Sequence, residues 1–279
     1  MIIYSDIISS RNNNTVKWAA SLAQKKGRDS SSCFIAEGEK LSLEALDAGL
    51  PVTHIFISES KKAFVMEKLS GYISDTFYEK TELITLSDGA FEKISTENAP
   101  QGIISVIKYL DFFRDIDIIY KEDFFVLPSE RIIILCSVRD PGNLGAVIRS
   151  AAAFGVEHII ITADSADIYN PKTVRSAMGS LFRVKISIVK DISSFVTALI
   201  DTGRRVFAAE LSDGARSVFE VALKPTDAII IGNEGHGIPK ELSNQASGSV
   251  FIPISKKTES LNAAVAAAVF MWEQSKQTL

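Results

Sequence analysis

Short apolar, β-rich runs alternate with helix-forming segments from Arg131 to the end of the chain, and this alternation is the strongest constraint on the fold. A helix is expected over Leu144–Phe154, ended by Gly155, and another begins at Asn170-Pro171, where asparagine caps and proline suits the first position. Such strands separated by helices are typical of a mostly parallel sheet covered on both faces. The expected strands are Arg131–Val138, Glu157–Thr162, Phe182–Val189, Arg204–Ala209, Asp227–Ile231 and Val250–Ile254.

Residues 12–108 predict a second, smaller α/β unit. A helix is expected from a cap at Asn14-Thr15 to a break at Gly27, and another over Lys40–Ala48, where Gly49 suits the left-handed position after a helix. The expected strands are Cys33–Ala36, His54–Ile57 and a β-rich run that follows Pro100 and ends at Lys108.

Residues 109–130 mix aromatic with acidic residues and fit neither pattern. We therefore expect an N-terminal domain over residues 1–112, a linker over residues 113–130 and a C-terminal domain over residues 131–279. The length of 279 residues suits this division.

Composition excludes several classes of protein. No apolar run reaches the ~18 residues that a membrane span needs, and Met1–Asp6 lacks the basic and apolar regions of a secretory signal. Two distant cysteines exclude a disulfide framework and fit a reducing cytoplasm. The three histidines have no metal-ligand spacing, so no metal is expected. These residues are Cys33, Cys136, His54, His158 and His236.

The charge distribution says more than the net charge of −4, which by itself argues mildly against a nucleic-acid-binding protein. From Ile7 to Arg28 every charged residue is basic, and an isolated cluster of this kind usually forms a solvated helix face. Its members are Arg11, Lys17, Lys25, Lys26 and Arg28.

The first segment that suggests chemistry is Asp140-Pro-Gly-Asn143-Leu-Gly-Ala-Val-Ile-Arg149. It follows a strand and opens a helix, so free N–H groups and a positive dipole lie at its start. Arg149 stands among small and apolar residues, where a guanidinium needs an anionic partner. That partner is either a structural carboxylate or a phosphate, whose geometry matches the planar guanidinium.

The second segment, Gly232-Asn-Glu234-Gly-His-Gly237, leaves the end of an apolar strand, where ligands bind in open α/β sheets. Its glycines permit close backbone approach. It lacks the spacing of a phosphate-binding P-loop, and a glycine-rich turn alone is weak evidence for a ligand.

The third segment runs from Pro253-Ile254 to Ser260-Leu261-Asn262 and into an alanine-rich helix. Ser260 or a neighbour is expected to cap that helix. Close packing explains the alanines but not the polar residues Ser260 and Asn262 at the helix start.

Together the three segments resemble the Asn-x-Gly-x-x-x-Arg, Gly-x-Glu-x-x-Gly and Ser-Leu-Asn motifs of the SpoU/TrmH family of SPOUT RNA methyltransferases, in order, spacing and context. The stretch Asn170–Phe182 resembles the segment between the first two motifs. In the N-terminal half, Lys25–Arg28, Phe34–Gly38, Glu44–Gly49 and Pro100–Gly102 resemble the family's substrate-binding domain. The resemblance covers about residues 15–108 and 131–275.

The resemblance implies a C-terminal α/β trefoil knot, an exception to the rule that chains do not thread loops, with a smaller ribosomal-protein-like α/β domain before it. It also implies S-adenosylmethionine as cofactor, an RNA rather than a DNA or membrane partner, and a homodimer formed through the C-terminal domain. The basic stretch up to Arg28 then becomes an RNA-contacting surface. By carry-over, Gly232, Glu234, Ile254 and Leu261 contact the cofactor, and Asn143, Arg149, Glu234, Ser260 and Asn262 form the catalytic site.

The implied reaction is methyl transfer to a ribose 2′-hydroxyl. Because a guanidinium stays protonated in proteins, we favour Arg149 as a phosphate-positioning group over Arg149 as a base. Pyrimidine C5 methylation would need a cysteine nucleophile, and Cys136 lies in an apolar run typical of a core.

Two other classes stay open: a non-catalytic RNA-binding member, which would lack Arg149, Glu234 or Asn262, and a nucleotide-binding α/β enzyme, whose phosphate loop would need another spacing. Family analogy favours rRNA over tRNA as the substrate.

Overall fold

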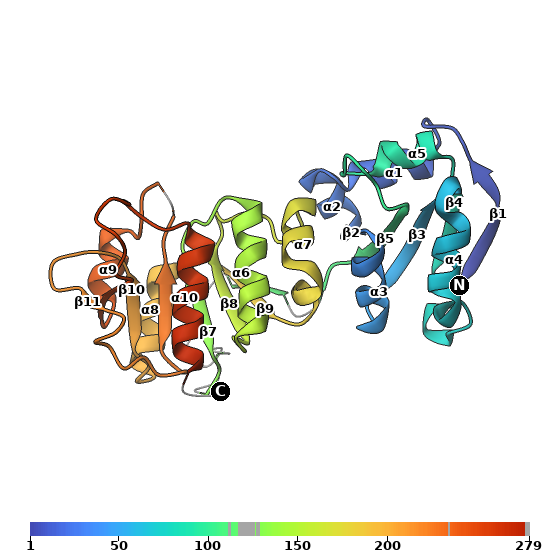
Figure 1. Ribbon diagram of the computed structural model, residues 1–279. Helices are drawn as coiled ribbons and strands as arrows, with labels where there is room; N and C mark the ends of the chain where they lie inside the picture. Colours follow the sequence, from blue (N-terminus) through green and yellow to red (C-terminus); the bar gives the residue numbers. More distant parts are fainter. Residues whose placement is uncertain (111–112, 117–125, 127–128, 234, 277–279) are drawn as a thin grey trace. The chain divides into compact units, whose positions relative to one another are not determined.

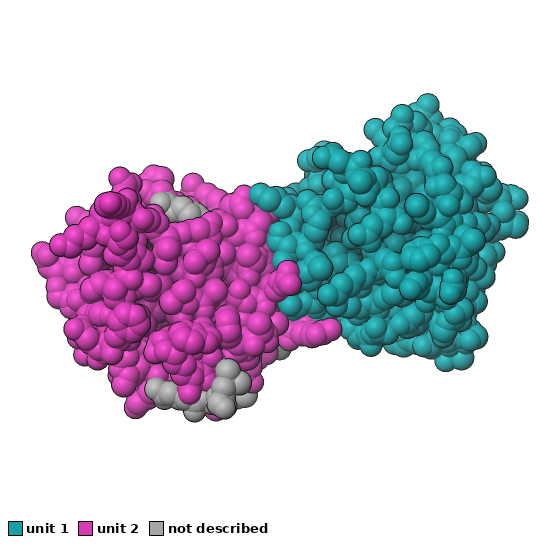
Figure 2. Space-filling model, viewed as in Figure 1, with its two compact units in different colours: residues 1–110, 167–182 teal, residues 111–166, 183–279 magenta. Residues whose placement is uncertain are grey.

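A computed structural model describes residues 1–110, 113–116, 126, 129–233 and 235–276 (Figure 1). The chain divides into two compact units (Figure 2). Unit 1 consists of residues 1–110 and 167–182, and unit 2 of residues 111–166 and 183–279.

Unit 1 is built on a five-stranded sheet in the order β1-β4-β3-β5-β2. Strands β1, β4 and β3 run parallel, and β5 is antiparallel to both β3 and β2. The strands are β1 (Ile2–Ile8), β2 (Cys33–Glu37), β3 (Val52–Ser58), β4 (Glu82–Leu86) and β5 (Ile103–Lys108). The expected strands at 33–36, 54–57 and before Lys108 are thus present.

The helices of unit 1 are α1 (Asn14–Ser21), α2 (Lys25–Ser31), α3 (Glu39–Asp47), α4 (Lys62–Ile73), α5 (Asp88–Ile94) and α7 (Pro171–Ala177), with short 3-10 helices η1 (Glu59–Lys61), η2 (Thr76–Tyr78) and η4 (Met178–Phe182). Gly49 follows α3 with φ +65°, as expected of a residue after a helix end. One side of the core joins α1 and α5 to the sheet through Val16, Phe56, Phe91 and Ile104.

Gly27 does not end the first helix. The side chain of Asn13 caps α1, which ends at Ser21, and Gly27 lies inside α2. A Cβ atom on Gly27 would come within 2.1 Å of the Ser21 carbonyl oxygen. Glycine is therefore needed here for close approach of two helices, not for a break.

Residues 167–182 pack with unit 1, although they lie in sequence between two strands of unit 2. Asp167 accepts a hydrogen bond from the Arg28 guanidinium at 2.5 Å, and the Tyr169 ring stacks on Tyr109 at 4.1 Å between ring centroids. Tyr169 also accepts a hydrogen bond from the Leu110 backbone N–H. Unit 1 therefore takes part of its core from the second half of the sequence.

The expectation that Arg28 contacts RNA is wrong. Arg28 is 1% exposed, and besides Asp167 it donates hydrogen bonds to the carbonyl oxygens of Leu22 and Ala23, each at 2.9 Å. A buried guanidinium needs such partners to offset its desolvation. The other basic residues of the cluster are exposed: Arg11, Lys17, Lys25 and Lys26.

Unit 2 contains an eight-stranded sheet in the order β11-β13-β10-β12-β7-β8-β9-β6, and all of its neighbouring strands run parallel. The strands are β6 (Phe113–Ile116), β7 (Ile132–Leu135), β8 (His158–Thr162), β9 (Lys185–Val189), β10 (Val206–Ala209), β11 (Arg216–Ser217), β12 (Ala228–Ile231) and β13 (Gly248–Phe251). The predicted parallel α/β fold is confirmed.

Helices cover both faces of this sheet: α6 (Pro141–Ala153), α8 (Ile192–Asp201), α9 (Lys240–Gln245) and α10 (Ala263–Ser275). In Figure 1, α6 and α10 lie in front of the sheet and α8 and α9 behind it. One hydrophobic core lies between the sheet and the helices α8 and α9. It contains Ile132 and Ile134 of β7, Cys136 just after this strand, Phe195 of α8 and Leu242 of α9. Cys136 is therefore a packed core residue, as expected, and burial raises the pKa of its thiol.

The predicted linker over 113–130 lies mostly outside the described residues. Its first four residues form β6, which pairs with β9. The domain boundaries at 112 and 131 stay a prediction, as does the trefoil knot. None of the described helices is long and apolar enough to span a bilayer.

Replacing Arg28 with methionine should destabilise unit 1 by about 3 kcal/mol, because the Asp167 carboxylate would lose its partner in a largely buried place. Urea unfolding followed by Trp18 fluorescence, in a Trp272→Phe background, would measure unit 1 alone, since the chain has two tryptophans.

Lys26→Met is the matched control, because Lys26 is exposed on the same helix and its loss should stay within ~0.5 kcal/mol. Equal effects of the two substitutions would show that the Arg28 ion pair contributes no special stability.

Candidate active site

The first segment forms the start of α6. Asp140 caps the helix, and its carboxylate accepts a hydrogen bond from the Asn143 backbone N–H at 2.8 Å. Pro141 takes the first position, which has no intrahelical partner for an N–H group. The Arg149 side chain is exposed and has no hydrogen bond or ion pair with another described residue. The sequence left two partners open for Arg149, a structural carboxylate or a phosphate. Among the described residues no carboxylate pairs with it.

The third segment meets the first at the start of α10. Asn262 caps α10 through its side-chain oxygen, which accepts from the N–H groups of Ala264 at 2.9 Å and Val265 at 3.3 Å. Its amide nitrogen donates to the side-chain oxygen of Asn143 at 3.0 Å. The helix cap is thus Asn262, one of the neighbours of Ser260 that the sequence allowed, and its side chain joins two segments 119 positions apart.

The second segment forms a tight loop after β12. Asn233 and Gly237 exchange backbone hydrogen bonds at 3.2 and 2.8 Å, and Gly237 has φ +68°. A Cβ on Gly232 would lie 2.4 Å from the Gly237 carbonyl carbon, so only glycine fits there. Glu234, which we expected to contact the cofactor and support catalysis, lies outside the described residues.

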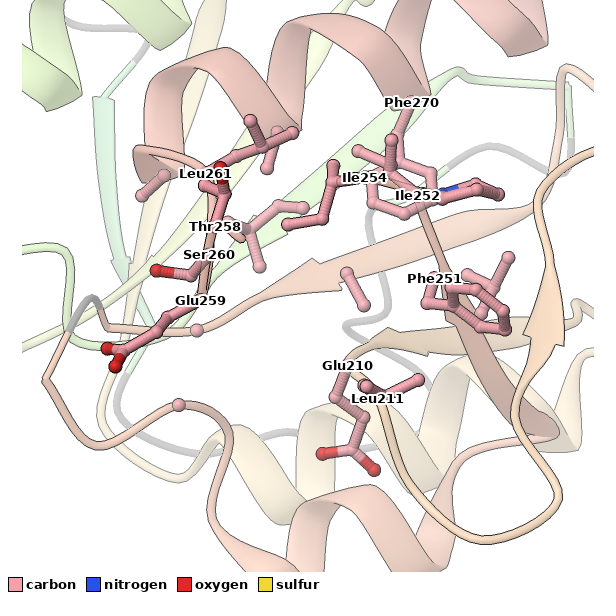
Figure 3. A pocket seen from close by; sticks show the side chains of 18 of the residues that line it. Glu210, Leu211, Phe251, Ile252, Ile254, Thr258, Glu259, Ser260, Leu261 and Phe270 are labelled. Carbon is pink, nitrogen blue, oxygen red and sulfur yellow. The ribbon is translucent and has the colours of Figure 1, made fainter. Parts of the chain in front are cut away.

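A pocket of about 630 Å³ opens between this loop and the third segment (Figure 3). Gly232, Ile254, Ser260 and Leu261, all singled out from the sequence, line it. Its volume falls within the range of about 300–1,000 Å³ typical of ligand sites. Three of the predicted catalytic residues do not line this pocket: Asn143, Arg149 and Asn262. Asn143 and Asn262 line a second, shallower hollow between α6 and α10.

Several lining residues were missed by the sequence analysis. Phe251 and Phe270 contribute aromatic walls from β13 and α10, and Glu210 follows β10. Glu210 accepts hydrogen bonds from the Ser243 and Ser249 hydroxyls at 2.5 and 3.0 Å. The one sequence signal that could have identified Glu210 is its position directly after a strand, because ligands bind at the carboxyl edge of a parallel sheet.

A polar cluster stands beside the pocket, at the carboxyl ends of β7 and β8. Asp164 accepts hydrogen bonds from Ser137, Thr162 and Arg139. Burial acts to raise the pKa of Asp164, but these hydrogen bonds outweigh it and lower the pKa to about 2. The stability that the cluster contributes is therefore present above about pH 4, the usual aspartate value, and is lost as the pH falls through 2.

The arrangement suits a particular chemistry. The apolar pocket with exposed backbone can hold an organic ligand, and no group of three histidine, cysteine or acidic side chains in the described chain could hold a metal. The joined amides of Asn143 and Asn262 can orient a hydrogen-bonding group, and the exposed Arg149 can bind an anion.

Comparison with known proteins agrees with this architecture. A family model described as the SpoU rRNA Methylase family matches residues 130–272, and one described as the MRM3-like substrate binding domain matches residues 13–105.

Relatives match over nearly the full length. The 23S rRNA (guanosine(2553)-2'-O)-methyltransferase of Bacillus subtilis is 29% identical over 95% of this chain and 97% of its own. The 23S rRNA (uridine(2479)-2'-O)-methyltransferase of Streptomyces viridochromogenes is 28% identical over 98% and 92%.

The crystal structure of an AdoMet-bound rRNA methyltransferase from Sinorhizobium meliloti superposes with a TM-score of 0.80, at 28% identity, over 99% of each chain. The first family model spans just over half of the chain and contains all three segments that build the site, and the chain therefore belongs to the SpoU rRNA Methylase family.

Proposed function

We propose that this protein is an S-adenosylmethionine-dependent RNA methyltransferase that modifies a ribose 2′-hydroxyl in rRNA. The observation that carries the proposal is the hydrogen bond between Asn143 and Asn262, because it joins the family's first and third motifs beside the pocket. The relatives named as rRNA 2'-O-methyltransferases support the substrate and the position of the methyl group.

The pocket fits S-adenosylmethionine. Gly232 lines the pocket and permits the tight turn of the loop against Gly237, and Ile254, Leu261 and Phe270 supply apolar surface for a planar base. Bound there, the cofactor supplies an activated methyl group to a nucleophilic oxygen. Gly232, Ile254, Leu261 and the family-matched Glu234 are the proposed cofactor contacts.

The chain's own residues position the reacting oxygen. A ribose hydroxyl is a weak acid whose proton must leave during transfer, but a guanidinium is already protonated and does not accept it. In the proposed transfer the methyl group bonds to the ribose oxygen, S-adenosylhomocysteine leaves, and the proton passes to solvent water. Arg149 binds an RNA phosphate and stabilises charge. Asn143, Asn262 and Ser260 orient groups around it, and Glu234 supports the same site.

Unit 1 is the proposed RNA-binding part. Arg11, Lys17, Lys25 and Lys26 are exposed, and α1 and α2 carry three of them with no acidic residue between Ile7 and Arg28. Phosphate contacts supply most of the affinity of proteins for nucleic acid, and the matched substrate-binding domain model covers these residues from 13 onward. The cytoplasm is the proposed location, where the free thiols of Cys33 and Cys136 stay reduced.

A second copy of the chain is the proposed occupant of the hollow between α6 and α10. Ala146, Ala264 and Ala268 permit close backbone approach there, while Val265 and Trp272 are 49% and 45% exposed. A homodimer would cover these apolar groups and would lie next to Asn143 and Asn262.

The methyl group should appear on a ribose. Ribosomal RNA from cells that lack this protein, methylated in vitro by the pure enzyme, should acquire one phosphodiester that resists mild alkali, because a 2′-O-methyl group removes the attacking oxygen. Mass spectrometry should find the added mass on the sugar fragment. Added mass on the base fragment would refute the ribose assignment, and modification of tRNA alone would refute rRNA as substrate.

Arg149→Ala should lower the methylation rate at least ~100-fold, since one charge-stabilising donor contributes about that much. The dissociation constant for S-adenosylmethionine, measured by calorimetry, should change less than about threefold, because Arg149 is assigned to the RNA side. Arg183→Ala, at another exposed arginine of unit 2, is the control. Lost cofactor binding in a folded Arg149→Ala protein would contradict the assignment.

Val265→Asp should convert the dimer to a monomer, because two aspartates would face an apolar interface without partners. Sedimentation equilibrium should show the mass fall by half while the circular dichroism spectrum is retained. Phe219→Asp, at a side chain 76% exposed and outside the hollow, should stay dimeric. A wild-type monomer would exclude the dimer.

A further inference from the structure

Ser137, the second residue after β7, has an unusual backbone that no step of the proposed mechanism uses. Its φ is +56°, in the left-handed region that non-glycine residues rarely adopt. Two hydrogen bonds hold it there: its N–H donates to the Thr162 hydroxyl at 2.8 Å, and its own hydroxyl donates to Asp164 at 3.0 Å.

Asp164 is the centre of this cluster. Its Oδ1 accepts from both Ser137 and Thr162, the latter at 2.7 Å, and its Oδ2 accepts from the Arg139 guanidinium at 2.9 Å. Thr162 thus bridges the Ser137 backbone and the same carboxylate. Removing the carboxylate would leave the Ser137 hydroxyl without its acceptor, and would leave the Thr162 hydroxyl with the Ser165 hydroxyl, 3.1 Å away, as its other side-chain partner.

The Ser137 carbonyl oxygen reaches the glycine-rich loop. It accepts a hydrogen bond from the side-chain nitrogen of Asn233 at 2.8 Å. The side-chain oxygen of Asn233 accepts from the N–H groups of Gly235 at 2.8 Å and His236 at 3.3 Å. Asn233 therefore fastens the loop that lines the pocket to the end of β7.

We infer that Asp164 is a positioning residue for S-adenosylmethionine: acting through Ser137 and Asn233, it holds the glycine-rich loop in the shape that binds the cofactor. The inference rests on the proposed function, because it assigns the pocket to that cofactor. Without Asp164, Ser137 would relax to an extended conformation, and its carbonyl would turn away from Asn233.

Asp164→Ala tests this inference. Calorimetry with S-adenosylmethionine should show affinity weakened by about tenfold, the effect of losing a hydrogen bond to a charged group. In a Ser137→Gly background the same substitution should reduce the affinity for S-adenosylmethionine much less, because glycine adopts a positive φ without strain. Asn233→Ala should weaken binding on its own, and Asp164→Ala should add little to it.

Asp191→Ala is the matched control for a purely structural effect. Asp191 caps α8 in the same unit through hydrogen bonds from the Ser194 N–H and hydroxyl at 3.0 and 2.6 Å, and among the described residues it does not line the pocket. Its removal should lower the thermal midpoint but leave the affinity for S-adenosylmethionine unchanged.

Wild-type affinity in Asp164→Ala, or an equal loss in the Ser137→Gly background, would overturn the inference. If Asp164→Ala does not fold, Asp164→Asn is the deciding variant, because asparagine keeps the shape of the side chain and one acceptor oxygen. Its affinity for S-adenosylmethionine should fall less than that of Asp164→Ala, and the Ser137→Gly background should again make the loss smaller. Failure of the wild-type protein itself to bind S-adenosylmethionine would instead refute the proposed function.

Discussion

The position of β7 between β12 and β8 is the constraint on which the rest of unit 2 depends. All three strands run parallel, so their carboxyl ends meet at one edge of the sheet. The start of α6, the glycine-rich loop and the Asp164 cluster leave that edge as immediate neighbours. The hydrogen bond from Asn233 to Ser137 forms because the strand order has already placed these two backbones together. The hydrogen bond from Asn262 to Asn143 depends instead on α10 packing against α6.

Two kinds of restraint shape this edge. Gly232 permits a close backbone approach that a Cβ atom would block, and Gly237 adopts a positive φ that other residues rarely adopt. Hydrogen bonds from side chains then select one conformation of the loop. Ser137 shows the reverse solution, since a non-glycine residue is held in the left-handed region by two partners on β8 and the loop after it. A site that must present backbone groups to a ligand gains a fixed shape from both.

Unit 1 depends on a buried charge. The Arg28 guanidinium joins α2 to Asp167, at the start of a segment that the sequence order assigns to the other half of the chain. Units 1 and 2 therefore do not correspond to two successive stretches of sequence. In sequence, Arg28 looks like part of a nucleic-acid-binding cluster, but its buried side chain stabilises the fold of unit 1. Its neighbours Lys25 and Lys26 are exposed, as a nucleic-acid-binding surface requires.

The regular strands of unit 2 were predictable because each is a short apolar run bounded by helix signals, and burial on both faces leaves little else possible. Strand β1 was not predicted, because Ile2, Ile3 and Tyr4 are apolar in succession and all exposed, so no alternation marks a buried face. The residues of β6 were predicted to be linker, because no local sequence pattern marks them as a strand. They form one only by pairing with β9, which lies far away in the sequence.

The sequence by itself determined the parallel α/β class, the three motif segments and four of the residues that line the pocket, Gly232, Ile254, Ser260 and Leu261. Those properties follow from local pattern and spacing. Only the tertiary structure decided that Arg28 is buried on Asp167, that Asn262 bonds Asn143, and that Asp164 reaches Asn233 through Ser137. Each of these depends on atoms brought together from distant positions by strand order and packing, which no local pattern encodes.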